Sequence, residues 1–213
     1  MALPATGLRE RKKQKTKEAI HRAAMRLFTK RGYEETTIEQ IAAAVEISPS
    51  TFFNYFPTKE DVVMLDLYDP MVIAMLQQGP KDEPLPDAFR RVLGGLDAVF
   101  ERDRELVLAR GRLMMEVPEL RSRLWDELER TQNFIVELLS ERTGRKPDDF
   151  ELRVTVRILI AALYEASIEW FRHGGRTRLV VLANRSLDVV EGGGLLGSAV
   201  VAKPRRGRVR VGA

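Results

Sequence analysis

The chain of 213 residues contains no cysteine. Disulfide bridges, thiolate metal sites and cysteine nucleophiles are excluded together, and the composition fits a reducing compartment. No run of about 18 apolar residues is present, so we expect neither a membrane-spanning helix nor a membrane partner. From these absences we predict a soluble, cytoplasmic protein.

Histidine is also scarce, because the chain has only His21 and His173. The two lie too far apart in sequence to support a metal site or a catalytic constellation. We therefore expect no metal, no cofactor and no enzymatic activity. His21 lies among basic residues on a predicted helix, and we expect its side chain to face solvent.

Positive charge is concentrated at the two ends of the chain, although the net charge is only +4. Residues 1–31 contain ten basic and two acidic side chains, and residues 192–213 contain five basic and no acidic ones. A basic first segment indicates a polyanionic partner, although a solvated helix face is the alternative. We interpret residues 1–13 as a basic arm and residues 195–213 as a basic flexible tail.

Hydrophobic residues recur at helical spacing almost throughout, and the only weak strand pattern is RGRVRV near the C-terminus. The predicted helices cover residues 19–31, 37–45, 48–56, 59–78 (interrupted at Asp69-Pro70), 89–100, 106–115, 118–143, 150–171 and 178–190. GPKDEPLP at 79–86 is the clearest linker. We predict an all-α protein with a three-helix unit within residues 14–74 and a larger helical domain within residues 75–194.

Two short capped helices stand close together near the N-terminus. Thr37 precedes the first, with Gln40 three residues later, which is the pattern of a capping box. Ser48 precedes the second, with Pro49 at the first helical position. Two such helices joined by a tight turn indicate a helix-turn-helix over about residues 37–56, whose second helix enters the DNA major groove.

In the stretch SPSTFFNYFPTKED the two faces of this second helix carry different kinds of side chain. Phe52 and Phe56 lie four residues apart and should face the core. Ser50 and Asn54 fall on the opposite face, where base edges would lie. An exposed Phe53 would suit a thymine methyl group.

Three linked motifs extend this interpretation. They are LF…GY within 27–33, TTIxxIA within 36–42 and SxxTFFxYFxxKE within 48–60. With them, residues 19–63 resemble the DNA-binding domain of the TetR family of transcriptional regulators. The resemblance implies a homodimer, in most members a repressor, whose C-terminal helical domain binds a small molecule and then releases DNA.

Carried over by position, the resemblance implies a set of DNA-contacting residues. They are Thr37, Ser48, Pro49, Ser50, Thr51, Phe53, Asn54, Tyr55 and Lys59. One position departs from the family pattern, because Glu46 stands where the turn usually has glycine. If its backbone is left-handed, a non-glycine residue costs about 1–2 kcal/mol there, and its carboxylate lies near the DNA.

Five of the seven methionines lie between Met64 and Met115. Methionine is adaptable and polarizable, so these residues could line a tolerant effector pocket, although plain core packing is the alternative. Trp125 and Trp170 are expected in the core first and in the pocket second. The candidate pocket residues are Met64, Leu67, Met71, Met75, Phe100, Met114, Trp125, Phe134 and Tyr164.

The segment ILIAALY, residues 158–164, has seven residues without a charge. A helix that is apolar all round must be buried on all sides, either in the protomer core or at a subunit interface. The resemblance implies that the last two helices form a two-fold interface. The candidate interface residues are Ile158, Ile160, Leu163, Leu179 and Leu182.

The sequence therefore predicts a dimeric, sequence-specific DNA-binding transcriptional regulator. We expect a repressor that reads a near-palindromic operator in double-stranded DNA and is released by a small apolar effector. The contrasting class is an all-helical small-molecule-binding protein or enzyme with an incidental helix-turn-helix. That class would need a convergent set of nucleophile, base or metal ligands, which the C-terminal two-thirds of the sequence does not offer.

Overall fold

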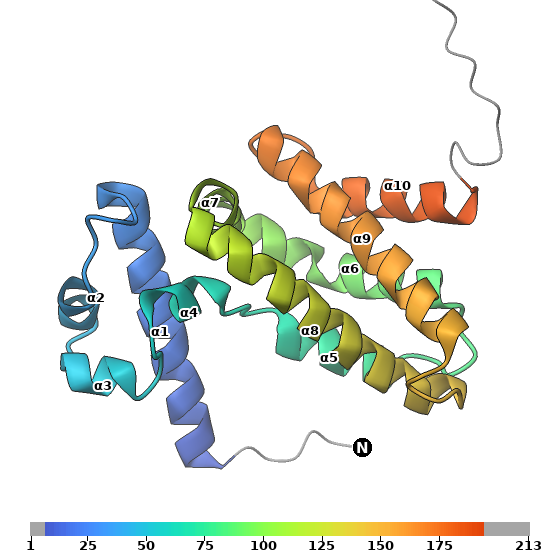
Figure 1. The fold of residues 1–213 in the computed structure, drawn as a ribbon, viewed down its shortest axis with the longest axis horizontal. Helices are drawn as coiled ribbons and strands as arrows, with labels where there is room; N and C mark the ends of the chain where they lie inside the picture. Colours follow the sequence, from blue (N-terminus) through green and yellow to red (C-terminus); the bar gives the residue numbers. More distant parts are fainter. Residues whose placement is uncertain (1–6, 194–213) are drawn as a thin grey trace, which may run out of the picture.

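The computed structural model describes residues 7–193, and these form ten α-helices without a strand, which confirms the predicted all-α class (Figure 1). The helices are α1 (Leu8–Arg31), α2 (Ile38–Ala44), α3 (Pro49–Phe53), α4 (Lys59–Met64), α5 (Asp69–Gln78), α6 (Leu85–Arg102), α7 (Arg104–Glu116), α8 (Pro118–Thr143), α9 (Phe150–Arg172) and α10 (Leu179–Glu191). The predicted tail, with its RGRVRV segment, lies outside the described residues.

Local capping sets the ends of the short N-terminal helices. The Thr37 side chain accepts the backbone N–H of Gln40 at 3.3 Å, and the Gln40 side chain accepts the N–H of Thr37, which completes the expected capping box. Ser48 accepts the N–H of Thr51 at 3.1 Å at the start of α3. Thr58 caps α4 in the same reciprocal way. These caps satisfy backbone donors that would otherwise lack a partner.

Two hydrophobic clusters form the interior. The first contains buried residues of α1 to α4 together with Met114 of α7 and Leu120 of α8. The second joins α5 and α6 to α8, α9 and α10. The expected boundary between residues 74 and 75 falls inside α5, whose buried Leu76 belongs to the second cluster. In Figure 1 the compact group of α1 to α4 lies beside the larger bundle of α5 to α10.

His21 is buried, so the prediction that it faces solvent is wrong. Its Nδ1–H donates to the backbone carbonyl of Val62 at 2.7 Å, which joins α1 to α4. Burial lowers the pKa of His21 to about 4, because the charged form would lose its hydration, so the ring is neutral at pH 7. The neighbouring basic residues did not indicate this, since a contact 41 positions away decides the burial.

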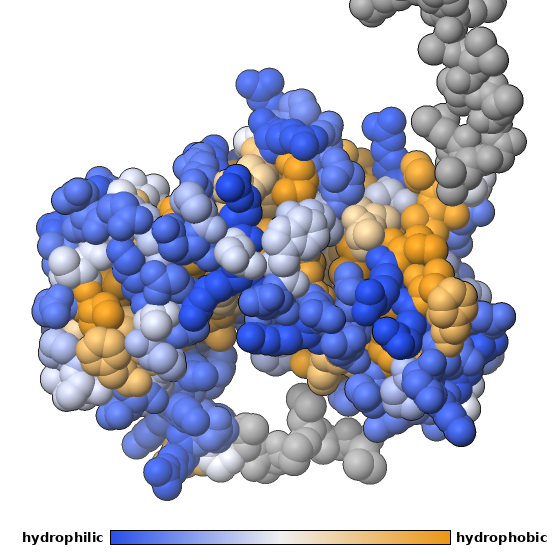
Figure 2. Space-filling model, viewed as in Figure 1, coloured by the Kyte–Doolittle hydropathy of each residue, from blue (hydrophilic) through white to orange (hydrophobic). Residues whose placement is uncertain are grey.

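A band of apolar side chains on the last two helices remains uncovered. The exposed large hydrophobic residues there are Phe150, Val154 and Ile158 on α9 and Val181 and Val189 on α10. Figure 2 shows hydrophobic surface over the region where α9 and α10 lie in Figure 1. No helix within residues 7–193 is both long and apolar enough to cross a membrane.

Candidate nucleic-acid interface and effector cavity

The turn between α2 and α3 is closed by backbone hydrogen bonds. The N–H of Ile47 donates to the carbonyl of Ala42 at 3.0 Å, and the N–H of Glu46 donates to that of Ala43 at 3.2 Å. This pair of bonds defines a Schellman motif, which requires a left-handed residue at the position of Glu46. Glu46 has a φ of 57°, and within residues 7–193 no other non-glycine residue has a positive φ. Glu46 therefore replaces glycine at a position whose backbone conformation favours glycine.

The aromatic residues of α3 divide between the core and the surface. Phe52 and Phe56 are 0% and 3% exposed, which confirms that they face the core, whereas Phe53 is 49% exposed. Pro49, Ser50 and Asn54 are also exposed, together with Phe53. One face of α3 thus anchors the helix, and the other offers an apolar ring, a hydroxyl and an amide to solvent.

Hydroxyl groups cluster at the beginning of α3. Ser48 Oγ lies 2.8 Å from Ser50 Oγ and 2.8 Å from Thr51 Oγ1. Thr37, at the beginning of α2, is exposed. Hydroxyl groups of this kind can donate to phosphate oxygens as well as to base edges.

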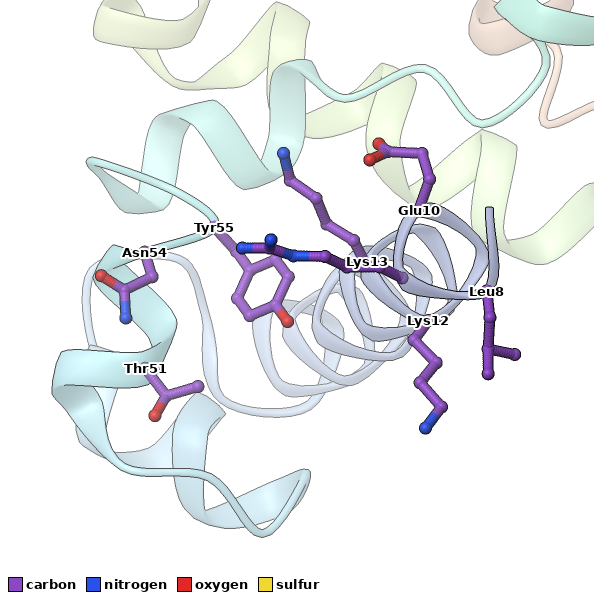
Figure 3. A pocket seen from close by; sticks show the side chains of 8 residues that line it. Leu8, Glu10, Lys12, Lys13, Thr51, Asn54 and Tyr55 are labelled. Atoms are coloured by element: carbon purple, nitrogen blue, oxygen red, sulfur yellow. The ribbon is translucent and has the colours of Figure 1, made fainter. Parts of the chain in front are cut away.

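A groove of about 810 Å³ separates the end of α3 from the beginning of α1. Thr51, Asn54 and Tyr55 line one side, and Figure 3 shows them opposite the first turns of α1. Arg9, Lys12 and Lys13 are among the residues that line the α1 side. Part of the expected N-terminal arm, residues 8–13, is therefore helical and lies next to α3. The sequence shows that these residues are basic, but it did not predict that they lie beside α3.

Lys59 has intramolecular partners. Its Nζ donates to the carbonyl of Tyr33 at 3.0 Å and lies 4.1 Å from the centre of the Tyr33 ring. The Lys59 side chain is 20% exposed, and its ammonium lies 3.8 Å from Glu34. The ammonium therefore supports the fold, and its remaining donor capacity is what a DNA phosphate could use.

A cavity of about 200 Å³ lies between α4, α7, α8 and α9. It brings together three of the predicted pocket residues, Met64, Met114 and Tyr164. Gly111 and Phe171 close one side, since a Cβ atom at Gly111 would lie 2.2 Å from the Phe171 ring. The lining is mostly apolar, with a few carboxylates and hydroxyls.

The other six predicted pocket residues do not line this cavity. Leu67 lines a separate void of about 10 Å³, Met75 and Phe100 pack against the second hydrophobic cluster, and Met71, Trp125 and Phe134 are exposed. Trp125 is 66% exposed, so its expected core position is wrong, whereas Trp170 is buried as predicted. The spacing of the methionines could not predict which residues line the cavity, because spacing along the chain does not determine how separate helices face one another.

Arg110 of α7 connects this cavity with α4, a role that no sequence pattern indicated. Its Nε donates to the carbonyl of Val63 at 2.8 Å and its Nη2 to that of Met64 at 3.1 Å. Its Nη1 donates to the carboxylate of Asp66 at 2.9 Å. Arg110 also lines the cavity, so one side chain contacts both the cavity and the end of α4.

The predicted interface residues occupy the last two helices, with different exposure. Ile158 is 48% exposed, whereas Ile160 and Leu163 are partly buried against the second cluster. Leu179 and Leu182 on α10 are also partly buried. The ILIAALY segment therefore serves the protomer core on one side and leaves an apolar side uncovered.

Two family models match the chain. Residues 20–64 match the model described as bacterial regulatory proteins, tetR family, and residues 83–194 match the MftR C-terminal domain. The transcriptional regulator TcmR of Streptomyces glaucescens is 36% identical over 174 residues, which cover 78% of this chain and 77% of that protein. The putative mycofactocin biosynthesis transcriptional regulator MftR of Mycobacterium tuberculosis is 23% identical, with coverage of 86% and 93%.

Solved structures share the architecture. FadR of Thermus thermophilus, a TetR-family repressor solved in complex with lauroyl-CoA, is 28% identical and has a TM-score of 0.53. The comparison covers 90% of this chain and 99% of that one. FadR of Bacillus subtilis, solved with stearoyl-CoA, has a TM-score of 0.56 at 19% identity and covers 83% of this chain and 98% of its own, and at that identity it supports the fold.

Proposed function

Since the chain belongs to the TetR family of bacterial regulatory proteins, we propose that it is a dimeric repressor that binds a near-palindromic operator and is released by a small apolar effector. The observation that carries this proposal is the exposed polar and aromatic face of α3, which lies beside the basic first turns of α1. A recognition helix reads base edges, while neighbouring cations hold the phosphates.

In this arrangement α3 enters the major groove. Asn54 and Ser50 hydrogen-bond to base edges, and the Phe53 ring packs on a thymine methyl group. Thr37, Tyr55 and Lys59 hold the backbone from the α2 and α4 sides. The DNA backbone passes through the groove between α3 and α1, where the lysines neutralise phosphates.

Footprinting on the DNA that flanks the gene tests this function. Asn54→Ala should cost about 1–3 kcal/mol on the true operator and little on unrelated DNA. Lys12→Ala should weaken binding on all sequences and lower the log–log salt slope by about 0.9 per contact, or twice that in a dimer. Gln77→Ala, an exposed substitution on α5, is the control. Absence of a protected near-palindrome would refute the proposal.

Dimerisation is supported by the uncovered apolar residues of α9 and α10. A two-fold interface pairs the same surface of both subunits, so Ile158 would meet the equivalent region of the second copy. The partly buried Ile160, Leu163, Leu179 and Leu182 would support this surface from behind. Two recognition helices related by this symmetry would contact successive half-sites of the operator.

The effector would occupy the cavity between α4, α7, α8 and α9. Its mostly apolar lining suits a hydrocarbon chain, and the 28% identical FadR of T. thermophilus was solved with lauroyl-CoA. Exposed Met71, Trp125 and Phe134 are not needed for this site. We infer an acyl chain or a similar apolar group as the part that enters the cavity.

Release of DNA would follow from a shift of α4. An effector that fills the cavity displaces Arg110, which holds the carbonyls of Val63 and Met64. The preceding carbonyl, that of Val62, accepts from His21 of α1, so the displacement reaches the helix that supports the DNA-binding unit. An effector acts only through a preference for the DNA-free arrangement, and couplings of about 1–3 kcal/mol are typical.

Arg110→Ala tests this route. The variant should still bind lauroyl-CoA, measured by fluorescence or calorimetry, but the ligand should no longer weaken operator binding. Arg121→Ala, a substitution on the exposed surface of α8, should retain the coupling. If Arg110→Ala releases DNA in response to lauroyl-CoA as the unmodified chain does, the coupling does not run through Arg110. If lauroyl-CoA does not bind the unmodified chain, the effector class is wrong, while the DNA-binding proposal stands.

A further inference from the structure

A second groove, of about 470 Å³, lies between α1 and the junction of α6 and α7. Its apolar lining includes Met25 and Leu108, which are 1% and 4% exposed. The groove shares no lining residue with the effector cavity, and α7 contributes different residues to each. It therefore lies between the DNA-binding unit and the larger helical bundle, away from the cavity already described.

Positive charge dominates this groove. Arg22, Arg26 and Lys30 follow one another at four-residue spacing on α1, so they form a row on one face. Arg102 and Arg112 line the opposite side.

The two carboxylates that line the groove compensate only part of this charge. Asp103 accepts from Arg22 at 3.2 Å and from Arg102 at 3.1 Å. Glu105 is 92% exposed and pairs with Arg104. Within residues 7–193, three of the lining cations, Arg26, Lys30 and Arg112, form no ion pair.

Uncompensated cations on facing walls repel one another, and a multiply charged anion between them would remove that repulsion. Guanidinium groups bind phosphate oxygens in a bidentate manner, and the lysine adds a compact charge. Leu106 and Ala109 of α7 also line the groove and are only partly buried, so they offer apolar surface that suits a ring or a short hydrocarbon rather than a hydrated inorganic ion. We propose that this groove binds a phosphate-bearing organic anion with at least two negative charges and an apolar ring, of the nucleoside diphosphate class.

An anion in this groove would act on the contact between the two parts of the molecule. Asp103 joins Arg22 of α1 to Arg102 of α6, and it also accepts from the hydroxyl of Tyr68 at 3.3 Å. The bound phosphates compete with Asp103 for both guanidinium groups. The affinity for the anion is therefore linked to the position of α1 against α7.

Calorimetric titration of the full chain without DNA, at low ionic strength, tests the proposal with three probes. ADP carries charge and a ring, pyrophosphate carries the charge alone, and adenosine carries the ring alone. ADP should bind saturably and most tightly, pyrophosphate should bind more weakly, and adenosine should not bind. Lys30→Glu and Arg112→Glu should each weaken ADP binding at least tenfold, because each removes a hydrogen bond to a charged group and also places a carboxylate beside the phosphates.

Arg31→Glu is the matched control, because Arg31 follows Lys30 on α1, is exposed and does not line the groove. It should leave ADP affinity unchanged. An equal loss in Arg31→Glu and Lys30→Glu would show that ADP responds to the general positive field of α1, and would overturn the assignment. Absence of saturable ADP binding would also overturn the assignment. Pyrophosphate binding as tight as that of ADP would refute the role of the apolar lining. Lys30, Arg31 and Arg112 are all exposed, so the variants should fold, which circular dichroism can verify.

Discussion

Replacement of Glu46 by glycine should stabilise the protein and strengthen DNA binding, through two separate causes. The φ of 57° costs a non-glycine residue about 1–2 kcal/mol. Glycine removes that strain but loses more conformational entropy on folding, which costs about 0.5–1 kcal/mol. The middle of the two ranges gives a net gain of about 0.75 kcal/mol, which corresponds to a rise in melting temperature of about 1.5–3 °C for a chain of this length.

Glu46→Ala separates the two causes. Alanine keeps the left-handed strain but removes the carboxylate, so its melting temperature should not rise. Operator affinity should rise in both variants, because in the proposed complex each would lack an anion that Glu46 places near the DNA phosphates. Thermal unfolding by circular dichroism and gel-shift titration measure the two effects independently.

The backbone explanation fails if alanine stabilises the protein as much as glycine does. In that case the gain would come from the lost carboxylate and not from φ. It also fails if glycine leaves the melting temperature unchanged. A rise in operator affinity for glycine but not for alanine would instead show that the geometry of the turn, and not its charge, limits DNA binding.

Three further predictions concern the core, the subunit interface and acid stability. Phe52→Ala should lower the free energy of unfolding by about 3–5 kcal/mol, whereas Phe53→Ala should leave stability nearly unchanged and weaken operator binding. If only the Phe53 variant fails to fold, the core face and the exposed face of α3 are assigned the wrong way round. Ile158→Asp should give a folded monomer in light scattering, whereas Leu159→Asp, at a position only 2% exposed, should unfold, and a dimeric Ile158 variant would exclude this interface. Because the pKa of His21 is about 4 in the folded protein and about 6.5 in the unfolded chain, the contribution of His21 to stability should be constant above about pH 6.5 and should fall by about 3 kcal/mol as the pH drops to about 4. Asp69, whose pKa burial raises to about 6, changes stability in the opposite direction over this range, so the His21 contribution is the difference in urea unfolding between the unmodified chain and His21→Gln, and a difference that does not change with pH would refute it.

Features set by neighbouring residues could be predicted from the sequence. The caps at Thr37, Ser48 and Thr58 depend on a hydroxyl and a backbone donor three residues apart, and all three form in the structure. The core positions of Phe52 and Phe56 follow from helical spacing in the same way. A short-range pattern is enough where the interaction itself is short-range.

Features set by the placement of distant helices could not be predicted. His21 is buried through a carbonyl on α4, and Arg110 reaches the end of α4 from α7. The effector cavity needs four helices to meet, so only three of nine candidates line it, and Trp125 remains on the surface. Composition identifies adaptable side chains, but only tertiary packing decides which of them surround the same space.

The first hydrophobic cluster limits how freely the DNA-binding unit can be exchanged between relatives. Met114 and Leu120 complete that cluster from the other part of the chain, and Arg123 of α8 pairs with Asp61 of α4 at 2.7 Å. A chimera joined after α4 would combine α1 to α4 of one protein with α7 and α8 of another. The residues that complete the first cluster would then no longer match. An exchange of this unit between related regulators should therefore transfer the end of α7 and the first turns of α8 together with α1 to α4.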